Sequence, residues 1–389
     1  MPTMPPATLP ADRPDPSEPD IVVVALSARS LAAAARRAGR RPAAIDLFGD
    51  QDTRRLAAPC ITLPSHGLRL DGDALLEALA RPDLRSLPLV YGAGFEDSPA
   101  LLARIAEGRP VLGNAAEAVA RIKDPFAFAA TLDGLGIPHP AVARRLAGRP
   151  DGHLLKRIGG SGGGHIAPAA TAVAPRGCYF QQRLEGHAVS VLFLANGRRA
   201  EIVGLSRQWT TPTAEAPYRY GGAAGPLRIP PRLYGPLPEM MTSLAAAFGL
   251  VGMNSADLLL NADGFQLLEV NPRPGASLDV FDRAPMPPLL GLHLTSCAGR
   301  LPERLPVLPD CRAAEILYAT DAVLIVEGAR WPAWTADRPA PPARMSAGEP
   351  VCTVMADGAG VRAARRRVQQ RRQRVAAGLR AALTTETGA

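Results

Sequence analysis

The sequence has almost no lysine. Only Lys123 and Lys156 among its 44 basic residues are lysines, although the formal net charge is +8. In a composition this rich in Ala, Pro and Arg, arginine replaces lysine wherever charge alone is required. A compact ammonium group fits between phosphate oxygens where the wider guanidinium would clash. We therefore predict that both lysines contact phosphate; the alternative is that they persist by chance.

Cysteine and histidine are also scarce and widely spaced. The five cysteines never form CxxC, and the six histidines form neither HxxxH nor HExxH. These absences argue against a zinc ribbon, a disulfide scaffold and the common transition-metal sites. No apolar run reaches the roughly 18 residues of a membrane span, and the Pro-rich residues 1–19 lack the pattern of a signal peptide. We expect free thiols, a loose N-terminal tail over 1–19 and a cytoplasmic protein.

The next hundred residues alternate apolar runs with helical patterns. Strands are expected at 21–26, 43–48 and 87–91, and helices at 74–80 and 99–106. Strand–helix alternation is typical of a parallel sheet with right-handed crossovers. We predict an α/β chain whose residues 20–114 form a Rossmann-like lobe. Dinucleotide binding is not expected there, because no GxGxxG follows the first strand.

A polar cluster is predicted on a hairpin between residues 254 and 279. Apolar runs flank a turn at Ala262-Asp263-Gly264, so that Asn261 pairs with Phe265 and Asp257 lies opposite Glu269. Side chains alternate along a strand, which places Asp257, Glu269 and Asn271 on one face. Two carboxylates and an amide suit Mg²⁺, which completes its shell with water and substrate phosphate. The alternative is a surface hairpin with a polar end.

A glycine loop follows the strand that carries Lys156. Residues 159–164 comprise five glycines and Ser161, a composition that cannot pack as a strand or helix. Backbone amides of such a loop can converge on phosphate oxygens beside a strand-borne lysine. In a P-loop the lysine follows the glycines, so Walker chemistry is disfavoured here. The alternative is a flexible linker.

Residues beyond this loop give a mixed pattern. Strands are expected at 177–186, 188–194 and 199–204, with the last two joined at Asn196-Gly197, and a helix at 237–248. Residues 209–231, rich in Pro, Gly, Tyr and Thr, have little periodicity. We interpret them as a long substrate-facing loop.

The C-terminal part combines short strands with a basic helix. Strands are expected at 314–318, 322–326 and 350–355. Helical spacing runs through Val361, Ala364, Val368, Val375, Leu379 and Ala382, which gives one docking face. Seven arginines lie between 362 and 374, a density compatible with nucleic-acid or acidic-polymer binding. Because no aromatic residue is interleaved for base stacking, a solvated face is favoured and nucleic-acid binding is not predicted.

Taken together, these motifs resemble the ATP-grasp superfamily over roughly residues 20–300. The resemblance rests on the two lysines, the glycine loop, QQRLEG and EVNPR, in that order. SVLFLANGRRAEIVGLSRQW, YGGAAGPL and EVNPRPGASLD look like the carboligase-like branch related to biotin carboxylase, known from methanogens and methylotrophs. The implied organisation is a tail (1–19), a Rossmann-like domain (20–114), an ATP-grasp domain (115–300) with a small mobile lobe near 140–185, and a β-rich C-terminal domain (301–389).

The resemblance also implies residue roles. Lys123, Lys156 and the loop residues Gly159, Gly160, Ser161, Gly162 and Gly163 would hold ATP phosphates, and Gln182, Arg183, Leu184 and Glu185 would form the adenine hinge. Asp257, Glu269 and Asn271 would carry Mg²⁺ (or Mn²⁺), while Lys156 and Arg273 would serve the transition state. Many members have a glutamate for the ribose where this chain has Ala188, with Glu185 as a possible substitute.

The resulting hypothesis is an ATP- and Mg²⁺-dependent ligase that joins a small-molecule carboxylate to an amine through an acyl phosphate. Biosynthesis of a C1-carrier coenzyme of the methanopterin or methanofuran type is the setting implied by the branch. A homodimer without membrane association is expected. The alternatives are carboxylase-like phosphorylation of bicarbonate, a nucleotide-binding regulator without turnover, and an RNA-binding protein that acts through its arginine-rich tail.

Overall fold

The N-terminal part is a parallel sheet covered by helices. In the computed structural model, which describes residues 18–64, 67–261 and 264–386, this sheet has the strand order β3-β2-β1-β4. Its elements are β1 (Ile21–Val24), α1 (Arg29–Arg37), β2 (Pro42–Asp46), α2 (Gln51–Leu56), β3 (Cys60–Thr62), α3 (Gly72–Leu79), β4 (Leu89–Tyr91) and α4 (Pro99–Gly108). β1 and β2 are buried throughout, which explains their continuous apolar runs. Most of the expected tail, residues 1–17, lies outside the described residues.

Two helices lead from this sheet into a small antiparallel lobe. They are α5 (Ala116–Lys123) and α6 (Pro125–Leu135). The lobe has the strand order β5-β8-β6-β7, formed by β5 (Val142–Ala143), β6 (His153–Arg157), β7 (Ile166–Pro168) and β8 (Cys178–Gln182). The glycine loop connects β6 to β7 within one sheet, so it is a hairpin loop and the linker alternative is wrong.

A sheet of eight strands forms the centre of the molecule. Its order is β13-β12-β9-β10-β11-β14-β18-β16. The strands are β9 (His187–Asn196), β10 (Ala200–Thr210), β11 (Tyr220–Gly225), β12 (Val251–Leu260), β13 (Phe265–Asn271), β14 (Cys311–Tyr318), β16 (Thr335–Ala336) and β18 (Pro350–Gly358). The C-terminal strands therefore extend the same sheet through the β11–β14 pair.

Alternating side chains of this sheet enter two cores. Val191 and Phe193 of β9 pack with α8 (Leu237–Phe248), whereas Leu192 and Leu194 pack in the core shared with α1 and α10 (Leu289–Cys297). This alternation is the period of two expected for a strand covered on both faces. The sheet is thus a middle layer between α8 and the N-terminal part.

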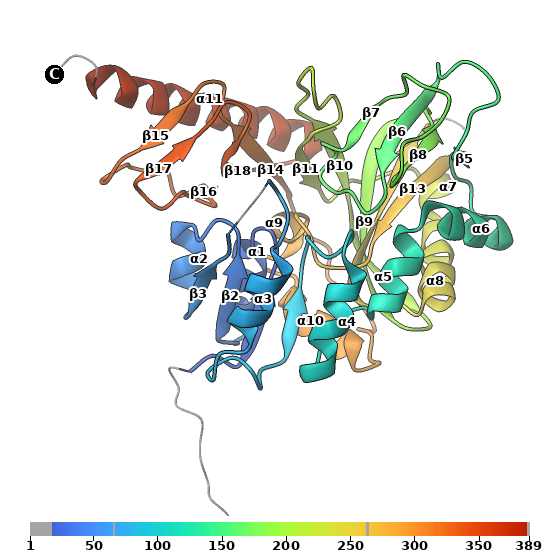
Figure 1. The fold of residues 1–389 in the computed structure, drawn as a ribbon, viewed down its shortest axis with the longest axis horizontal. Coiled ribbons are helices and arrows are strands. Elements are labelled where there is room, and N and C mark those ends of the chain that lie inside the picture. The colour runs from blue at the N-terminus through green and yellow to red at the C-terminus, as the bar shows by residue number, and fades with distance from the viewer. Residues whose placement is uncertain (1–17, 65–66, 262–263, 387–389) are drawn as a thin grey trace, which may run out of the picture.

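The remaining elements complete the C-terminal half. They are α7 (Pro231–Tyr234), α9 (Leu278–Phe281), β15 (Val323–Ile325), β17 (Ala343–Met345) and α11 (Val361–Glu386). Figure 1 shows α11 crossing the C-terminal strands at the top left, with the small lobe at the upper right. No helix within the described ranges is long and apolar enough to cross a membrane.

The expected loop over residues 209–231 is wrong at its centre. Residues 220–225 form β11, a nearly completely buried strand between β10 and β14. Its sequence YGGAAG hides the strand because small residues produce no apolar alternation. A Cβ on Gly222 would lie 2.4 Å from the carbonyl oxygen of Ala314, so the close approach of neighbouring backbones requires glycine.

An ion-pair network joins the N-terminal helices to distant segments. The Arg29 guanidinium binds Asp279 (Nη2–Oδ2, 2.7 Å) and Asp337 (Nε–Oδ1, 3.0 Å). Arg338 binds Asp52 at the start of α2 through Nε and Oδ2 (2.9 Å). Planar guanidinium groups suit such bidentate pairing. Residues 337–338 are thereby fixed to the N-terminal part.

A buried histidine secures the join between α10 and β12. His293 accepts a hydrogen bond at Nδ1 from the Met253 amide (2.8 Å), and its Nε2 lies 2.9 Å from the Leu112 carbonyl oxygen. This pairing places the proton of a neutral ring on Nε2. Burial lowers the pKa of His293 to about 4.

The depressed pKa predicts a specific pH dependence of stability. Between about pH 6.5 and pH 4 the unfolded chain binds a proton that folded His293 does not, so stability is full above pH 6.5 and falls with pH by up to about 3 kcal/mol. In His293→Gln this component should be absent. Urea unfolding across this range measures it, with exposed His187→Gln on β9 as the control; an unchanged slope in His293→Gln would contradict the assignment.

Candidate active site

The predicted metal hairpin forms with a register different at its tip. Leu260, not Asn261, pairs with Phe265, and the predicted turn residues 262–263 lie outside the described residues. An irregularity between Asp257 and Leu258 then shifts the pairing by one residue. Asp257 consequently lies opposite Glu269, as the sequence predicted. This irregularity is a β-bulge, and because of it the Asp257 and Glu269 carboxylates lie opposite each other.

The three candidate metal ligands lie together. Asn271 donates from Nδ2 to Asp257 Oδ2 (3.1 Å) and faces Glu269 Oε1 at 3.5 Å. Gln208 Nε2 also lies 3.3 Å from Asp257 Oδ1. The Glu269 side chain is 34% exposed, which leaves its carboxylate accessible to a ligand.

Both lysines converge on this cluster. Lys123 donates to Asn271 Oδ1 (3.0 Å) and lies 3.9 Å from Glu269 Oε2. Its position follows from the sequence, because Asp124 caps α6 and Pro125 occupies its first turn, so α5 must end at Lys123. Lys156 is 4% exposed and donates to Gln181 Oε1 at 2.9 Å.

Charge and burial act in opposite directions at these groups. Burial alone would raise the pKa of Glu269, but Lys123, Lys156 and His165 outweigh it and hold the pKa below its ordinary value. Burial and the neighbouring Glu269 charge raise the pKa of Asp257. Burial lowers the pKa of Lys156, against the opposing effect of Glu269. Additional positive charge would therefore stabilise the ionised pair of carboxylates.

The cluster fits a divalent cation that also binds a nucleotide. Within the described part of the chain, no group of three or more His, Cys, Asp and Glu side chains could hold a metal by itself. Two carboxylates and one amide are the partial oxygen set that Mg²⁺ accepts when phosphates and water supply the remainder. To bind the ion, Asn271 Oδ1 would have to lose the hydrogen bond that it accepts from Lys123.

Arg273 has a partner that the sequence did not reveal. Its Nε donates to Glu96 Oε1 at 2.7 Å, and both side chains are largely buried. Burial opposes ionisation of Glu96, yet Arg273, Lys123 and the amide of Gly94 lower its pKa. In the sequence, the only feature that marked this region was the Gly92-Ala93-Gly94 turn after β4. Glu96 thus positions Arg273 from the N-terminal part.

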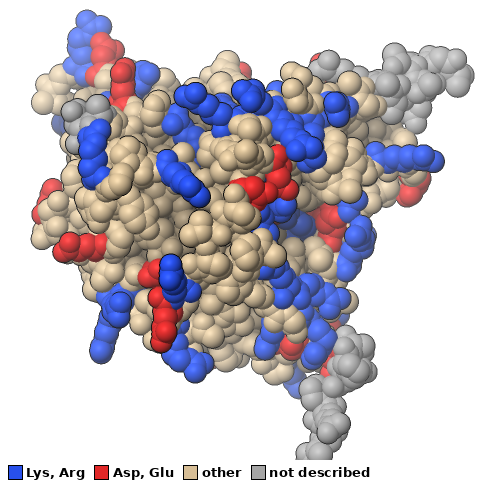
Figure 2. Space-filling view, turned by 180° about the vertical axis from the view of Figure 1, so that it is seen from behind, with Lys and Arg blue, Asp and Glu red and all other residues tan. Residues whose placement is uncertain are grey.

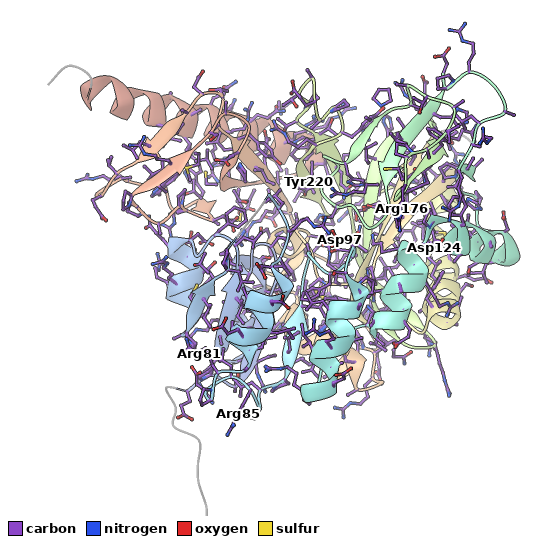
Figure 3. The ribbon with its side chains drawn as sticks, in the orientation of Figure 1. Arg81, Arg85, Asp97, Asp124, Arg176 and Tyr220 are labelled. Atoms are coloured by element: carbon purple, nitrogen blue, oxygen red, sulfur yellow. The ribbon has the colours of Figure 1, made fainter. Side chains whose placement is uncertain are left out.

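The glycine loop is docked on both sides. A Cβ on Gly159 would lie 2.6 Å from Asp97 Cα, and Tyr220 donates its amide to the Gly162 carbonyl (2.9 Å). In Figure 3, Asp97 and Tyr220 appear in the central region of the molecule. The loop therefore lies over the cluster in contact with the N-terminal part and β11.

A cavity lies between α5, α6, the small lobe and β13. It measures about 40 Å³, space for only a few waters at the ~15 Å³ that each requires. Its lining includes Lys123, Gly159, Gly160, His165, Gln181 and Glu269. A nucleotide is much larger than this volume.

The predicted adenine hinge is only partly available. The amide of Gln182 donates to Ala141 and that of Arg183 to Gly152, each at 2.8 Å. A base would have to use other groups of residues 182–185. The side chain that contacts Lys156 is Gln181, one residue before the predicted segment. The strand register, which the sequence alone did not fix, determines this inward position.

Comparison with known proteins agrees with this geometry. Residues 122–277 match the model of a family described as the ATP-grasp domain. That segment contains both lysines, the glycine loop and the predicted metal hairpin, and it is similar to an ATP-grasp domain; the predicted α/β class with the ATP-grasp fold is confirmed. A comparison with curated proteins found no match.

Solved structures share the fold over most of the chain. The biotin carboxylase domain of Hydrogenobacter thermophilus 2-oxoglutarate carboxylase has a TM-score of 0.66 at 12% identity, covering 88% of this chain and 87% of that one. Campylobacter jejuni biotin carboxylase gives 0.65 at 13%, covering 88% of each. N5-carboxyaminoimidazole ribonucleotide synthetase gives 0.64 at 14%, covering 93% and 97%. At these identities the likeness establishes the fold.

Loop docking can be tested with two neighbouring glycines. Gly162 and Gly163 both have positive φ (69° and 75°), but only a Cβ on Gly163 would meet backbone, at 2.0 Å from the Tyr218 carbonyl oxygen. Gly163→Ala should therefore undock the loop and speed hydrogen exchange over residues 158–166. Gly162→Ala should cost only the backbone strain of the left-handed conformation, about 1 kcal/mol. Equal exchange in the two variants would argue against docking.

The Arg273–Glu96 pair predicts a large stability effect. Glu96→Ala leaves a buried guanidinium without its carboxylate and should cost about 3 kcal/mol in denaturant unfolding. Exposed Glu107→Ala should cost less than about 0.5 kcal/mol. Similar losses in both variants would show that Arg273 does not depend on Glu96.

Proposed function

We propose that this chain is an ATP- and Mg²⁺-dependent ligase that joins a small-molecule carboxylate to an amine. The observation that carries the proposal is the convergence of the only two ammonium side chains on Asp257, Glu269 and Asn271. The lysines neutralise phosphate oxygens, and the acids bind the cation that accompanies a nucleotide. Positive and negative groups in this arrangement fit a triphosphate with its metal ion.

The proposed chemistry has two steps. A carboxylate oxygen of the substrate attacks the γ-phosphorus of ATP, the bond to the β-phosphate oxygen breaks, and an acyl phosphate and ADP form. The amine then attacks the acyl carbon, loses a proton to solvent and releases phosphate, which leaves an amide. Mg²⁺ supplies charge neutralisation at the phosphates.

The chain's own residues bind, orient and shield the reactants. Lys123 and Lys156 would hold phosphate oxygens, and the residues 159–164 loop would exclude water by docking over them. Arg273, fixed by Glu96, would direct its remaining donors to the substrate carboxylate or the transferring phosphoryl group. Holding the reactants in line provides most of the acceleration in such transfers, so no protein nucleophile is needed.

A carboxylase-like reaction is the second candidate. Its support is that the chain matches two biotin carboxylase structures over 88% of its length, one of them described with MgADP and bicarbonate. In that reaction bicarbonate would take the place of the organic carboxylate. A regulator without turnover is the third candidate, since Ala188 offers no ribose contact and Glu185 is exposed.

The proposal extends to the metabolic role and the oligomeric state of the chain. The resemblance of EVNPRPGASLD to the carboligase-like branch supports a step in C1-carrier coenzyme biosynthesis. We propose a cytoplasmic homodimer, in line with the dimer described for the Hydrogenobacter structure. Light scattering of the purified chain tests the dimer.

A substrate screen followed by mass spectrometry tests the reaction. ADP release that requires both a carboxylate and an amine, with an amide product, supports the ligase. ADP release on bicarbonate identifies the carboxylase, and ATP binding without ADP identifies the regulator.

A matched pair of variants then tests the metal assignment. Glu269→Gln should lower turnover at least about 100-fold because the ion loses a carboxylate, while Glu239→Gln, exposed on α8, should leave it unchanged. Circular dichroism checks that both variants fold. Unaltered turnover in Glu269→Gln would refute the metal site.

A further inference from the structure

The arginine-rich helix α11 carries a groove remote from the ATP-grasp cluster. The large sheet has β13, with the candidate metal ligands, at one edge and the β18–β16 pair at the other. Helix α11 packs on β18 and β14, near that second edge. Figure 2 shows Lys and Arg side chains gathered along the upper edge of the molecule, beside the grey C-terminal residues. Any function of this groove is separate from the ATP site.

The helix divides its arginines between two environments. Ala364, Val368 and Val375 are buried against the C-terminal strands. On the same inner side, Arg372 pairs with buried Glu315 (Nε–Oε1, 2.8 Å) and Arg365 lies 4.8 Å from the Trp209 ring centroid. These two arginines therefore serve packing, and their charges are directed into the fold.

Three other arginines surround a hollow. Arg367, Arg371 and Arg374 are spaced by four and three residues, so they share one helix face. With Gln370 and Trp334 they line a groove of about 220 Å³, far more than the ~15 Å³ that one water occupies. The groove thus presents three guanidinium groups, an amide and an indole to the same space.

The arginines of this groove form no ion pair with a carboxylate within the described part of the chain. Among the described ion pairs, none joins Arg367, Arg371 or Arg374 to a carboxylate. The nearby acid Asp357 is already bound by Arg312 through two contacts (2.6 and 2.9 Å). Burial, Arg367 and Arg374 lower the pKa of Arg371, against the opposing effect of Asp357. An external anion would relieve this repulsion.

The aromatic partner comes from elsewhere in the fold. Helix α11 itself contains no aromatic residue, which is why its sequence favoured a solvated face. Trp334, just before β16, is fixed by the Met355 amide, which donates to its carbonyl (2.9 Å), and the Arg371 guanidinium lies 5.0 Å from its ring centroid. Tertiary structure therefore adds the planar surface that base stacking needs.

We propose that this groove binds nucleotide phosphates, with Arg367, Arg371 and Arg374 on the phosphate oxygens and the base against Trp334. Guanidinium forks match phosphate geometry, and an indole packs on any base. An acidic polypeptide offers carboxylates but no planar ring for Trp334. The phosphates could belong to a free nucleotide or to single-stranded nucleic acid, which share this chemistry.

The charge contribution is tested with two double variants of equal charge change. Binding of a fluorescein-labelled oligothymidylate of about ten nucleotides is measured by anisotropy at several salt concentrations. Arg367→Gln/Arg374→Gln should weaken binding at least about tenfold and reduce the salt slope by about 1.4, the value for two lost contacts. Arg362→Gln/Arg366→Gln, exposed on the same helix outside the groove, should change it less than about threefold. Equal losses, or no binding by the parent, would overturn the proposal.

The base contact is tested with Trp334→Leu. This variant should weaken oligothymidylate binding while leaving inorganic pyrophosphate binding unchanged, with thermal unfolding to confirm the fold. Equal binding of polyglutamate and oligothymidylate by the parent would overturn the nucleotide assignment. If thymidine monophosphate binds in the groove as tightly as the oligonucleotide, the ligand is a free nucleotide. If it binds much more weakly, the ligand is single-stranded nucleic acid. Glu269→Gln should leave oligonucleotide binding intact, so failure here is distinct from failure of the ligase proposal.

Discussion

The balance of charge between Lys123, Lys156 and the hairpin carboxylates governs the arrangement of this molecule. Each lysine comes from a different element, α5 or β6, and both act on Glu269 from β13. Burial makes this grouping costly unless charges of opposite sign stay close. The three elements must therefore hold their relative positions. The docked glycine loop and the Glu96–Arg273 pair help to do so from two sides.

Site residues could be predicted from the sequence where they follow a local pattern, and were missed where their role depends on tertiary contacts. Asp257 and Glu269 could be placed opposite each other because strand periodicity is strict, yet the predicted tip pairing was wrong and a bulge compensated for it. Gln181 and Glu96 were missed because their roles depend on register and on a contact between segments 177 residues apart. Pairings so remote in sequence leave no local pattern.

The fold shows the same division between local and tertiary information. The buried strands of the N-terminal sheet were predicted from their continuous apolar runs, and the apolar face of α11 from its helical period. Strand β11 was mistaken for a loop because its glycines and alanines carry no period and reveal a strand only through their neighbours. The Trp334 contact with Arg371 was equally invisible, since the two residues meet only after β16 pairs with β18.

The pairing of β11 with β14 has a consequence for how the chain can be divided. Because this ladder continues the central sheet into the C-terminal strands, cutting the chain after residue 300 would strip β11 of one neighbour. A glycine-rich backbone edge would then face solvent with unpaired amides and carbonyls, a surface that attracts other chains. The C-terminal quarter is thus an integral part of the folding unit, and shortened forms are prone to aggregate.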